Sequence, residues 1–293
     1  MLLSQVIDLY LKDAESIKRY SKHSITAYSK DLYDFTEFCR AVSKTEIEKL
    51  DKRVVKNYMM NLSESGLSKI SISRKLSSVR SLFKYAFQHN YIKINPVSGI
   101  SNPRSARKLP SVVSYNEILE VINNADEKNE NGILVKVIFE LLYGCALRVS
   151  ELCSINNDDI DLKSGILRVK GKGNKVRIVP VGEKSVLVIN QYLNSKKAVA
   201  ENKALLTNDR GSRLYPKFVY RIVNKYLSNV TDVERKSPHA LRHSAATHML
   251  DSGADLGAVK EILGHENLST TQIYTHVSIE RLKSTYKKSH PKS

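Results

Sequence analysis

The chain has 293 residues, enough for two domains, and its 41% hydrophobic and 26% charged composition excludes a largely disordered protein. A net charge of +17, spread over both halves, favours a polyanionic partner such as nucleic acid over a merely soluble basic protein. No stretch reaches the roughly 18–20 apolar residues that span a bilayer, and the N-terminus lacks the layout of a signal peptide. We therefore expect a cytoplasmic protein that makes no membrane contact.

Residues 1–95 predict a domain of helices, because apolar residues recur there at three- and four-residue spacing. The fourth of these helices is expected over residues 68–90. Its outward face carries basic side chains and few acids, so it is either a DNA-contacting face or a solvated one. These side chains are Lys69, Arg74, Lys75, Arg80 and Lys84.

Residues 96–110 predict a linker, since Pro96, Pro103 and Pro110 block a continuous helix. The basic residues between these prolines suit a segment that wraps around a DNA duplex. Residues 111–293 then predict a second, mixed domain, with two strands at 166–170 and 176–180 joined by a hairpin turn. The expected fold class is therefore mainly α with a small antiparallel β-sheet, in two domains.

Three cysteines occur, Cys39, Cys145 and Cys153, and they lack CxxC spacing. This pattern argues against a disulfide scaffold or a zinc site and predicts small, buried apolar side chains.

The segment from Ser237 to His243 contains the strongest candidate for an anion site. Ser237 followed by proline predicts a helix start, and His239 and Arg242 then share one face of its first turns. Unpaired backbone N–H groups and the helix dipole favour a phosphate at such a place. The alternative is a capped helix with an exposed arginine and a core histidine.

A second cluster of signals follows Gly264, which is expected to end a helix at Leu263. His265 would lie on the next loop. Ser269 or Thr270 can cap a further helix that carries Tyr274. Spacing alone does not distinguish Tyr274 from the other 14 of the chain's 15 tyrosines, most of which we expect to be structural.

Two further elements have both a functional and an ordinary interpretation. Arg148 and Glu151 stand three residues apart near a predicted helix start, which is also the spacing of an exposed salt bridge. Lys172 lies between two glycines in the hairpin turn, where it would reach a bound DNA backbone or simply be solvated.

Taken together, the order and spacing of these residues resemble the tyrosine recombinase (phage integrase) family, most closely its Xer-type site-specific recombinases. The resemblance covers roughly residues 107–293, and it is most specific over 171–180 and 268–277. It implies a SAM-like core-binding domain at residues 1–95 and a catalytic domain at 111–293 that ends in an oligomerisation helix. Three residues depart from the family pattern: Ala146, Ala245 and Gly257.

The resemblance implies a site of six catalytic residues: Arg148, Lys172, His239, Arg242, His265 and Tyr274. Tyr274 would attack the scissile phosphorus, and the two arginines would hold the nonbridging oxygens. Lys172 would protonate the leaving 5′-oxygen, His239 would accept or orient the tyrosine proton, and His265 would hydrogen-bond the phosphate. No cofactor and no metal are expected, because the potential zinc pair His239 and His243 lacks a third ligand at suitable spacing.

The implied partner is a double-stranded DNA target site, bound by a tetramer across two sites. The tetramer would be a homo-oligomer or would include a related recombinase, and a DNA translocase of the division machinery is a further implied partner. The expected function is chromosome dimer resolution. Alternatives are an integrase or transposase of a mobile element, a type IB topoisomerase, and a regulator that binds DNA without cutting it.

Overall fold

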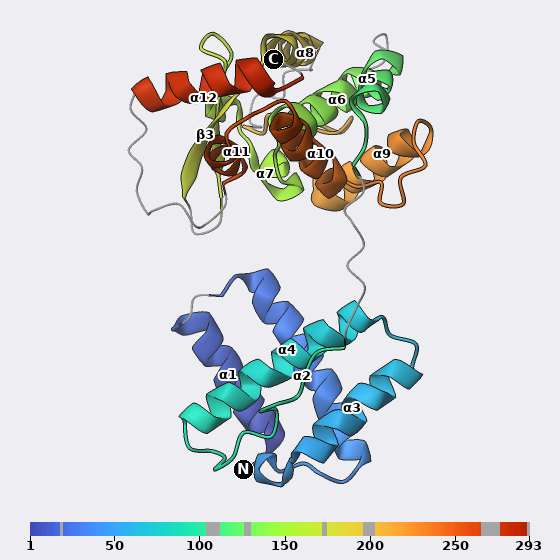
Figure 1. The fold of residues 1–293 in the computed structure, drawn as a ribbon, viewed down its shortest axis with the longest axis vertical. Helices are drawn as coiled ribbons and strands as arrows, with labels where there is room; N and C mark the ends of the chain where they lie inside the picture. Colours follow the sequence, from blue (N-terminus) through green and yellow to red (C-terminus); the bar gives the residue numbers. More distant parts are fainter. Residues whose placement is uncertain are drawn as a thin grey trace. The chain divides into compact units, whose positions relative to one another are not determined.

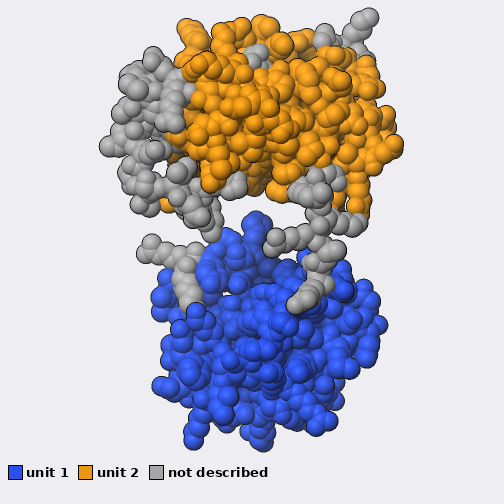
Figure 2. Space-filling model, viewed as in Figure 1, with its two compact units in different colours: residues 1–108 blue, residues 109–293 orange. Residues whose placement is uncertain are grey.

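The chain folds into two compact units, Met1–Lys108 and Leu109–Ser293, each with its own hydrophobic core (Figures 1 and 2). The computed structural model describes residues 1–17, 20–103, 112–125, 130–171, 175–195, 203–264 and 276–291. Residues 104–111, which include all three basic residues of the predicted linker, lie outside these ranges. The combination of many helices with one small antiparallel sheet confirms the predicted fold class.

The described residues of the first unit form four helices and one short 3₁₀ turn. In chain order these are α1 (Leu3–Ser16), α2 (Lys22–Ala41), η1 (Ile47–Lys49), α3 (Lys52–Glu64) and α4 (Lys69–Gln88). Side-chain caps begin three of the helices: Ser21, Asp51 and Ser68 each accept a hydrogen bond from a backbone N–H three residues ahead. α4 packs against the other three helices, so the inward faces of all four helices form one core.

The basic face predicted for α4 is only partly available, which corrects the expectation from sequence. Lys75 is buried, forms an ion pair with Asp34, and lies 3.5 Å from the buried carboxylate of Asp31. Arg74 also pairs with Asp31. The acids come from α2, which packs against α4, so spacing along α4 alone did not reveal them. Lys69 and Lys84 remain exposed.

The second unit surrounds α6, whose residues 132–139 are all buried, including the charged Lys136. The elements before the sheet are α5 (Tyr115–Asn124), α6 (Glu130–Phe139), the π-helical turn η2 (Glu140–Gly144), α7 (Val149–Ser154) and η3 (Asn157–Asp159). The helices after it are α8 (Glu183–Ser195), α9 (Pro216–Ser228), α10 (Pro238–Asp251), α11 (Leu256–Leu263) and α12 (His276–Ser289).

Within the described part of the unit, the sheet has three antiparallel strands in the order β1 (Ile160–Asp161), β2 (Ile166–Lys170) and β3 (Val176–Pro180). Alternate residues of β2 and β3 face opposite sides, as the pleat requires. Leu167, Val169, Arg177 and Val179 are buried on one side. The predicted strands and the predicted start of α10 after Ser237 are confirmed.

The last helix, α12, packs against β3, α10 and α11 of its own unit (Figure 1). Tyr286 and His290 are buried and stack with ring centroids 4.7 Å apart. The hydroxyl of Tyr115 donates a hydrogen bond to the Pro291 carbonyl at 2.9 Å, which connects the residues just after α12 to α5. Docking of this helix onto a neighbouring protomer stays a prediction.

All three cysteines are buried and free, as predicted. Among the described residues, no helix is long and apolar enough to cross a membrane.

Candidate active site

The structure describes three of the six predicted catalytic residues. Arg148 begins α7, and His239 and Arg242 lie in the first turns of α10. The other three, Lys172, His265 and Tyr274, lie outside the described residues. The described part of the site therefore consists of His239, the arginines and the groups that hold the arginines.

Three arginines from three different elements surround one buried carboxylate, that of Glu151. Arg177 of β3 donates two hydrogen bonds to it, at 2.7 and 2.8 Å. Arg148 donates one from its guanidinium at 2.7 Å and one from its backbone N–H at 2.8 Å. Nη1 of Arg242 lies 3.6 Å from the same carboxylate. The predicted pair of Arg148 and Glu151 is thus part of a buried network and is not a solvated surface bridge.

This network keeps Glu151 ionised. Burial by itself would raise the pKa of the carboxyl. The hydrogen bonds and charge of Arg177, followed by the hydrogen bonds from Arg148, outweigh burial and lower the pKa of Glu151 to about 2. At neutral pH, the described cluster therefore contains three guanidinium cations and one carboxylate, an excess of two positive charges.

The same three arginines also bind three consecutive carbonyl groups at the C-terminal end of α11. The pairs are Arg177 Nε with the Ile262 oxygen at 2.9 Å, Arg242 with the Leu263 oxygen, and Arg148 Nη2 with the Gly264 oxygen at 3.3 Å. The last carbonyls of a helix have no partner within it, and they form the negative end of its dipole. The end of α11 thereby orients all three guanidinium groups.

Gly264 ends α11 in the left-handed conformation, with φ of 63°. A Cβ atom placed there would lie 2.9 Å from Cδ of Arg177, closer than side-chain carbons normally approach. The glycine is therefore required both by the backbone angle and by the arginine packed against it. The chain continues from this turn directly to His265.

Arg242 is buried, with 6% of its surface exposed. Burial, and then the neighbouring charge of Arg148, lower the pKa of its guanidinium to about 10, so it remains charged at neutral pH. It donates a second hydrogen bond to the carbonyl of Ala146. Ala146, two residues after the end of the π-helical turn η2, has a φ of 48°, in the left-handed region that favours glycine.

Arg148 differs from the other two arginines because 42% of its side chain is exposed. His239 is exposed as well, on the first turn of α10 and three residues before Arg242. The alternative interpretation of His239 as a core histidine is therefore wrong. A half-exposed arginine in a cluster of net positive charge provides donors for an anion, and guanidinium geometry suits two oxygens of a phosphate.

Sequence reasoning did not assign Arg177 to the site, although Arg177 donates two guanidinium hydrogen bonds to Glu151. One signal was available: alternation places Arg177 on the same side of β3 as the buried Val179. A charged residue at an inward strand position requires a buried partner. Its partner, Glu151, lies 26 residues earlier in the chain, and spacing rules do not reach that far.

Two family descriptions match the chain: "Phage integrase family" over residues 112–281 and "Phage integrase, N-terminal SAM-like domain" over residues 7–90. A tyrosine recombinase XerC of Thermodesulfovibrio yellowstonii is 40% identical over 291 residues, which cover 97% of this chain and 95% of that protein. The chain belongs to the phage integrase family of tyrosine recombinases.

The recombinase is also similar to a tyrosine recombinase XerD of Staphylococcus haemolyticus, with 34% identity covering 99% of this chain and all of the relative. Among solved structures, it resembles the XerH recombinase bound to its palindromic difH substrate in a post-cleavage complex. That match has a TM-score of 0.74 and 25% identity, and it covers 96% of this chain and 83% of the other. A λ integrase dimer on a core site, 18% identical with a TM-score of 0.71, shares the fold.

As a tyrosine recombinase, this protein catalyses site-specific DNA recombination. It cuts and rejoins strands by transesterification through a tyrosine intermediate and without a metal ion. Its partner is DNA.

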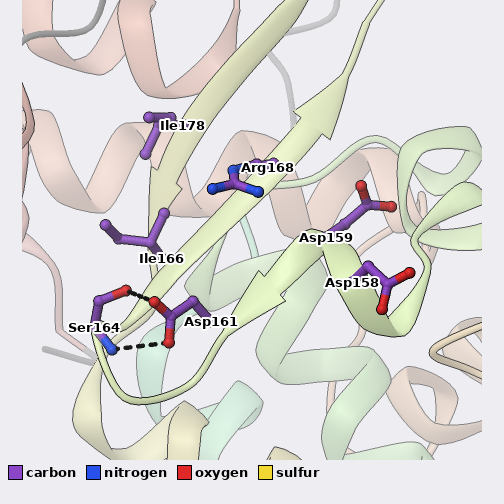
Figure 3. A pocket seen from close by; sticks show the side chains of 7 residues that line it. All are labelled: Asp158, Asp159, Asp161, Ser164, Ile166, Arg168 and Ile178. Atoms are coloured by element: carbon purple, nitrogen blue, oxygen red, sulfur yellow. Dashed lines mark hydrogen bonds between the residues drawn. The ribbon is translucent and has the colours of Figure 1, made fainter.

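The recombinase has a small hollow of about 130 Å³ (Figure 3). Arg168 and Ile178, which line it, alternate along β2 and β3 with residues on the buried side of the sheet, so the hollow lies on the opposite face from Arg177. Its lining includes Asp158, Asp159 and Asp161 together with Arg168. Asp161 accepts hydrogen bonds from the backbone and hydroxyl of Ser164, which shape the bend between β1 and β2. Three carboxylates oppose phosphate binding, so the arginine cluster is the candidate active site.

Proposed function

We propose that this recombinase cleaves one strand of duplex DNA with Tyr274, forming a 3′-phosphotyrosyl bond and releasing a 5′-hydroxyl. The phenolic oxygen replaces the 5′-oxygen on phosphorus, and a 5′-hydroxyl from the partner duplex later reverses the exchange. Each step makes one phosphodiester bond for each one broken, so no energy source is needed. The single observation that carries this proposal is the cluster of three arginines around Glu151 at the end of α11.

In this proposal Arg148 and Arg242 bind the two nonbridging oxygens of the scissile phosphate. Their permanent charge stabilises the additional negative charge of the pentavalent transition state. Their orientation is supported by hydrogen bonds to Glu151, Leu263 and Gly264 that hold both side chains before DNA arrives.

The remaining three groups complete the proposed site. His239, exposed on the first turn of α10, accepts or orients the proton of Tyr274. His265 hydrogen-bonds the phosphate. This role is supported by the contact of its neighbour Gly264 with Arg148. Lys172 donates a proton to the departing 5′-oxygen.

We also propose that α9 contacts the DNA backbone. Lys217, Arg221 and Lys225 are exposed and spaced four residues apart, which places them along one side of the helix. Arg221 donates a hydrogen bond to the hydroxyl of Tyr215 at 2.9 Å and lies over the ring of Phe218. Exposed cations in a row, with Arg221 held against aromatic side chains, can each contact a successive phosphate of a DNA strand. The helical first unit is proposed as a core-binding domain that also contacts the DNA site.

For the biological role, we propose resolution of chromosome dimers in the cytoplasm. The near full-length similarity to XerC and XerD recombinases supports this role. Four protomers would act on two paired sites through a Holliday junction, either as copies of this chain or together with a related recombinase. A DNA translocase of the division machinery is the proposed activating partner.

The chemistry is tested with a suicide substrate that carries a nick beside the scissile phosphate. We expect a covalent protein–DNA adduct that maps to Tyr274 and forms equally well in EDTA. The Tyr274→Phe variant should bind the same DNA without forming the adduct. Cleavage that requires a divalent metal and survives this substitution would contradict the proposal.

The role is tested by deleting the gene and by mapping the DNA bound to Tyr274 in cells. Chromosome dimer resolution predicts one chromosomal target and the accumulation of double-length circular chromosomes in the deletion strain. An integrase of a mobile element predicts excised element circles instead. A topoisomerase predicts that a monomer relaxes supercoiled DNA lacking any specific site.

A further inference from the structure

Arg177 is buried as deeply as Arg242, with 6% of its surface exposed. It donates through all three of its guanidinium nitrogens. Two of the bonds reach Glu151, and the third reaches the carbonyl of Ile262 at 2.9 Å. One planar group thus links β3 both to α7 and to the last turn of α11.

The carboxylate that Arg177 holds is shared with both proposed phosphate-binding arginines. Oε1 of Glu151 accepts from Arg177 and from the guanidinium of Arg148. Oε2 accepts from Arg177 and from the backbone of Arg148, and it faces Arg242 at 3.6 Å. Without Arg177, the carboxylate would lose two of its four hydrogen bonds and would be free to turn toward Arg242.

Arg177 also supports the turn from which His265 departs. Its Cδ, Nε and Nη1 atoms all lie within 3.2 Å of the position a Gly264 Cβ would occupy, so arginine and turn are in direct van der Waals contact. Gly264 in turn accepts a hydrogen bond from Arg148. The position of Arg177 therefore affects Arg148 through two routes, the carboxylate and the turn.

We propose that Arg177 is a positioning residue of the recombinase, which fixes Arg148 and Arg242 for the scissile phosphate through Glu151 and the Ile262–Gly264 turn. Arg177 does not touch the DNA itself. The inference rests on the phosphate-binding role proposed for Arg148 and Arg242. It extends that role to a residue on a strand that carries no proposed catalytic side chain.

A purely structural ion pair would contribute only to the free energy of unfolding. The test therefore needs a measurement that does not change when only the stability of the fold changes. Glu151 is faced by charges from three elements: Arg148 of α7, Arg177 of β3 and Arg242 of α10. Removing Arg177 takes away the largest influence that opposes burial of this carboxyl, so Glu151 should become protonated at mildly acidic pH. A protonated Glu151 orients Arg148 poorly, and cleavage should then slow as the pH falls.

The experiment measures the single-turnover rate of adduct formation at saturating suicide substrate, from pH 5 to pH 8, with the full chain. Arg177→Met should lower the rate by about 10–100-fold, as is typical when a group supporting an active-site ligand is removed. The rate of the Arg177→Met variant should fall further as the pH decreases toward 5, and we call this decrease the acid limb of its pH profile. The wild-type rate should show no acid limb. Affinity for the uncleaved DNA should stay near the wild-type value.

Two further variants keep the test decisive if Arg177→Met folds poorly. Arg177→Lys keeps the charge but cannot bind Glu151 and Ile262 together, so we expect a reduced rate without the acid limb. Arg177→Met combined with Glu151→Gln removes the titrating carboxyl, so the acid limb should disappear while the rate stays low. A wild-type rate in Arg177→Lys would overturn the proposal, as would an acid limb that persists in the double variant.

Arg213→Met is the matched control. Arg213 likewise donates from its guanidinium to backbone carbonyls, those of Cys153 and Ile155, both at 3.0 Å, and to the side chain of Asn156, but these hydrogen bonds do not involve Glu151. We expect the Arg213→Met variant to have a lower free energy of unfolding, but no acid limb in the pH profile of its cleavage rate. The same pH profile in both variants would show that Arg177 is merely structural. An adduct absent from the wild type, or mapped to another residue, would instead refute the proposed function itself.

Discussion

Arg177 packs directly against Gly264: a Cβ atom on this glycine would lie 2.9 Å from Cδ of the arginine. The contact joins the small sheet to the end of α11, where three arginines bind consecutive carbonyls. The arrangement of the candidate active site therefore depends on a glycine, a residue without a side chain.

The first prediction concerns Gly264→Ala. The substitution forces alanine into a left-handed backbone and against Arg177, so we expect a loss of unfolding free energy of about 1–3 kcal/mol and slower adduct formation. Urea unfolding and the suicide substrate measure the two effects. Gly253→Ala is the control, because Gly253 has φ of 81° but nothing within 4 Å of its Cβ position. If both variants slow cleavage equally, the packing of Gly264 against Arg177 has no role.

The second prediction is that Ala146→Gly stabilises the protein by about 1 kcal/mol, because glycine adopts the observed φ of 48° without strain. The carbonyl that accepts from Arg242 is retained, so adduct formation should continue at the wild-type rate. In contrast, Ala245→Gly, a buried position within α10, should destabilise by about 1 kcal/mol. A destabilised Ala146→Gly variant would show that this backbone angle is not strained.

The third prediction follows from the depressed pKa of Glu151. Its folded-state pKa of about 2 lies below the ordinary value of 4.5, so the ionised carboxylate stabilises the fold above pH 4.5. This stabilisation is lost as the pH falls from 4.5 toward 2, and it amounts to about 3 kcal/mol.

Urea unfolding of the wild type and of Glu151→Gln at pH 7 and pH 3 measures this effect. The difference in unfolding free energy should be largest at pH 7 and should shrink at pH 3. Glu183→Gln, at an exposed position on α8, should match the wild type at both pH values. A difference that is the same at both pH values would mean that Glu151 titrates normally.

The fourth prediction tests the basic row on α9. Lys217→Ala combined with Lys225→Ala should reduce the slope of log affinity against log salt concentration by about 2, since each phosphate that is no longer neutralised accounts for roughly 0.9. The control is Lys184→Ala combined with Lys203→Ala, which removes the same charge from exposed positions elsewhere in the unit. Equal slopes for the two double variants would place the DNA on a different surface.

The sequence by itself determined the features that depend on neighbours along the chain. Ser237 and Pro238 specify a helix start, and three-residue spacing then places His239 and Arg242 on one side of α10. Alternation likewise specified β2 and β3, and the glycine after Leu263 specified the end of α11. These are local consequences of backbone geometry, and the family resemblance named the chemistry that they suit.

Only the tertiary structure decided which charges meet. Lys75 was expected on an open basic face, but it is buried against acids that lie 41 and 44 residues earlier in the chain. Arg177 meets Glu151 across 26 residues, and Arg148 meets Gly264 across 116. Burial makes such pairs obligatory, because a charge removed from water needs a partner, yet the identity of that partner follows from how the helices and strands pack.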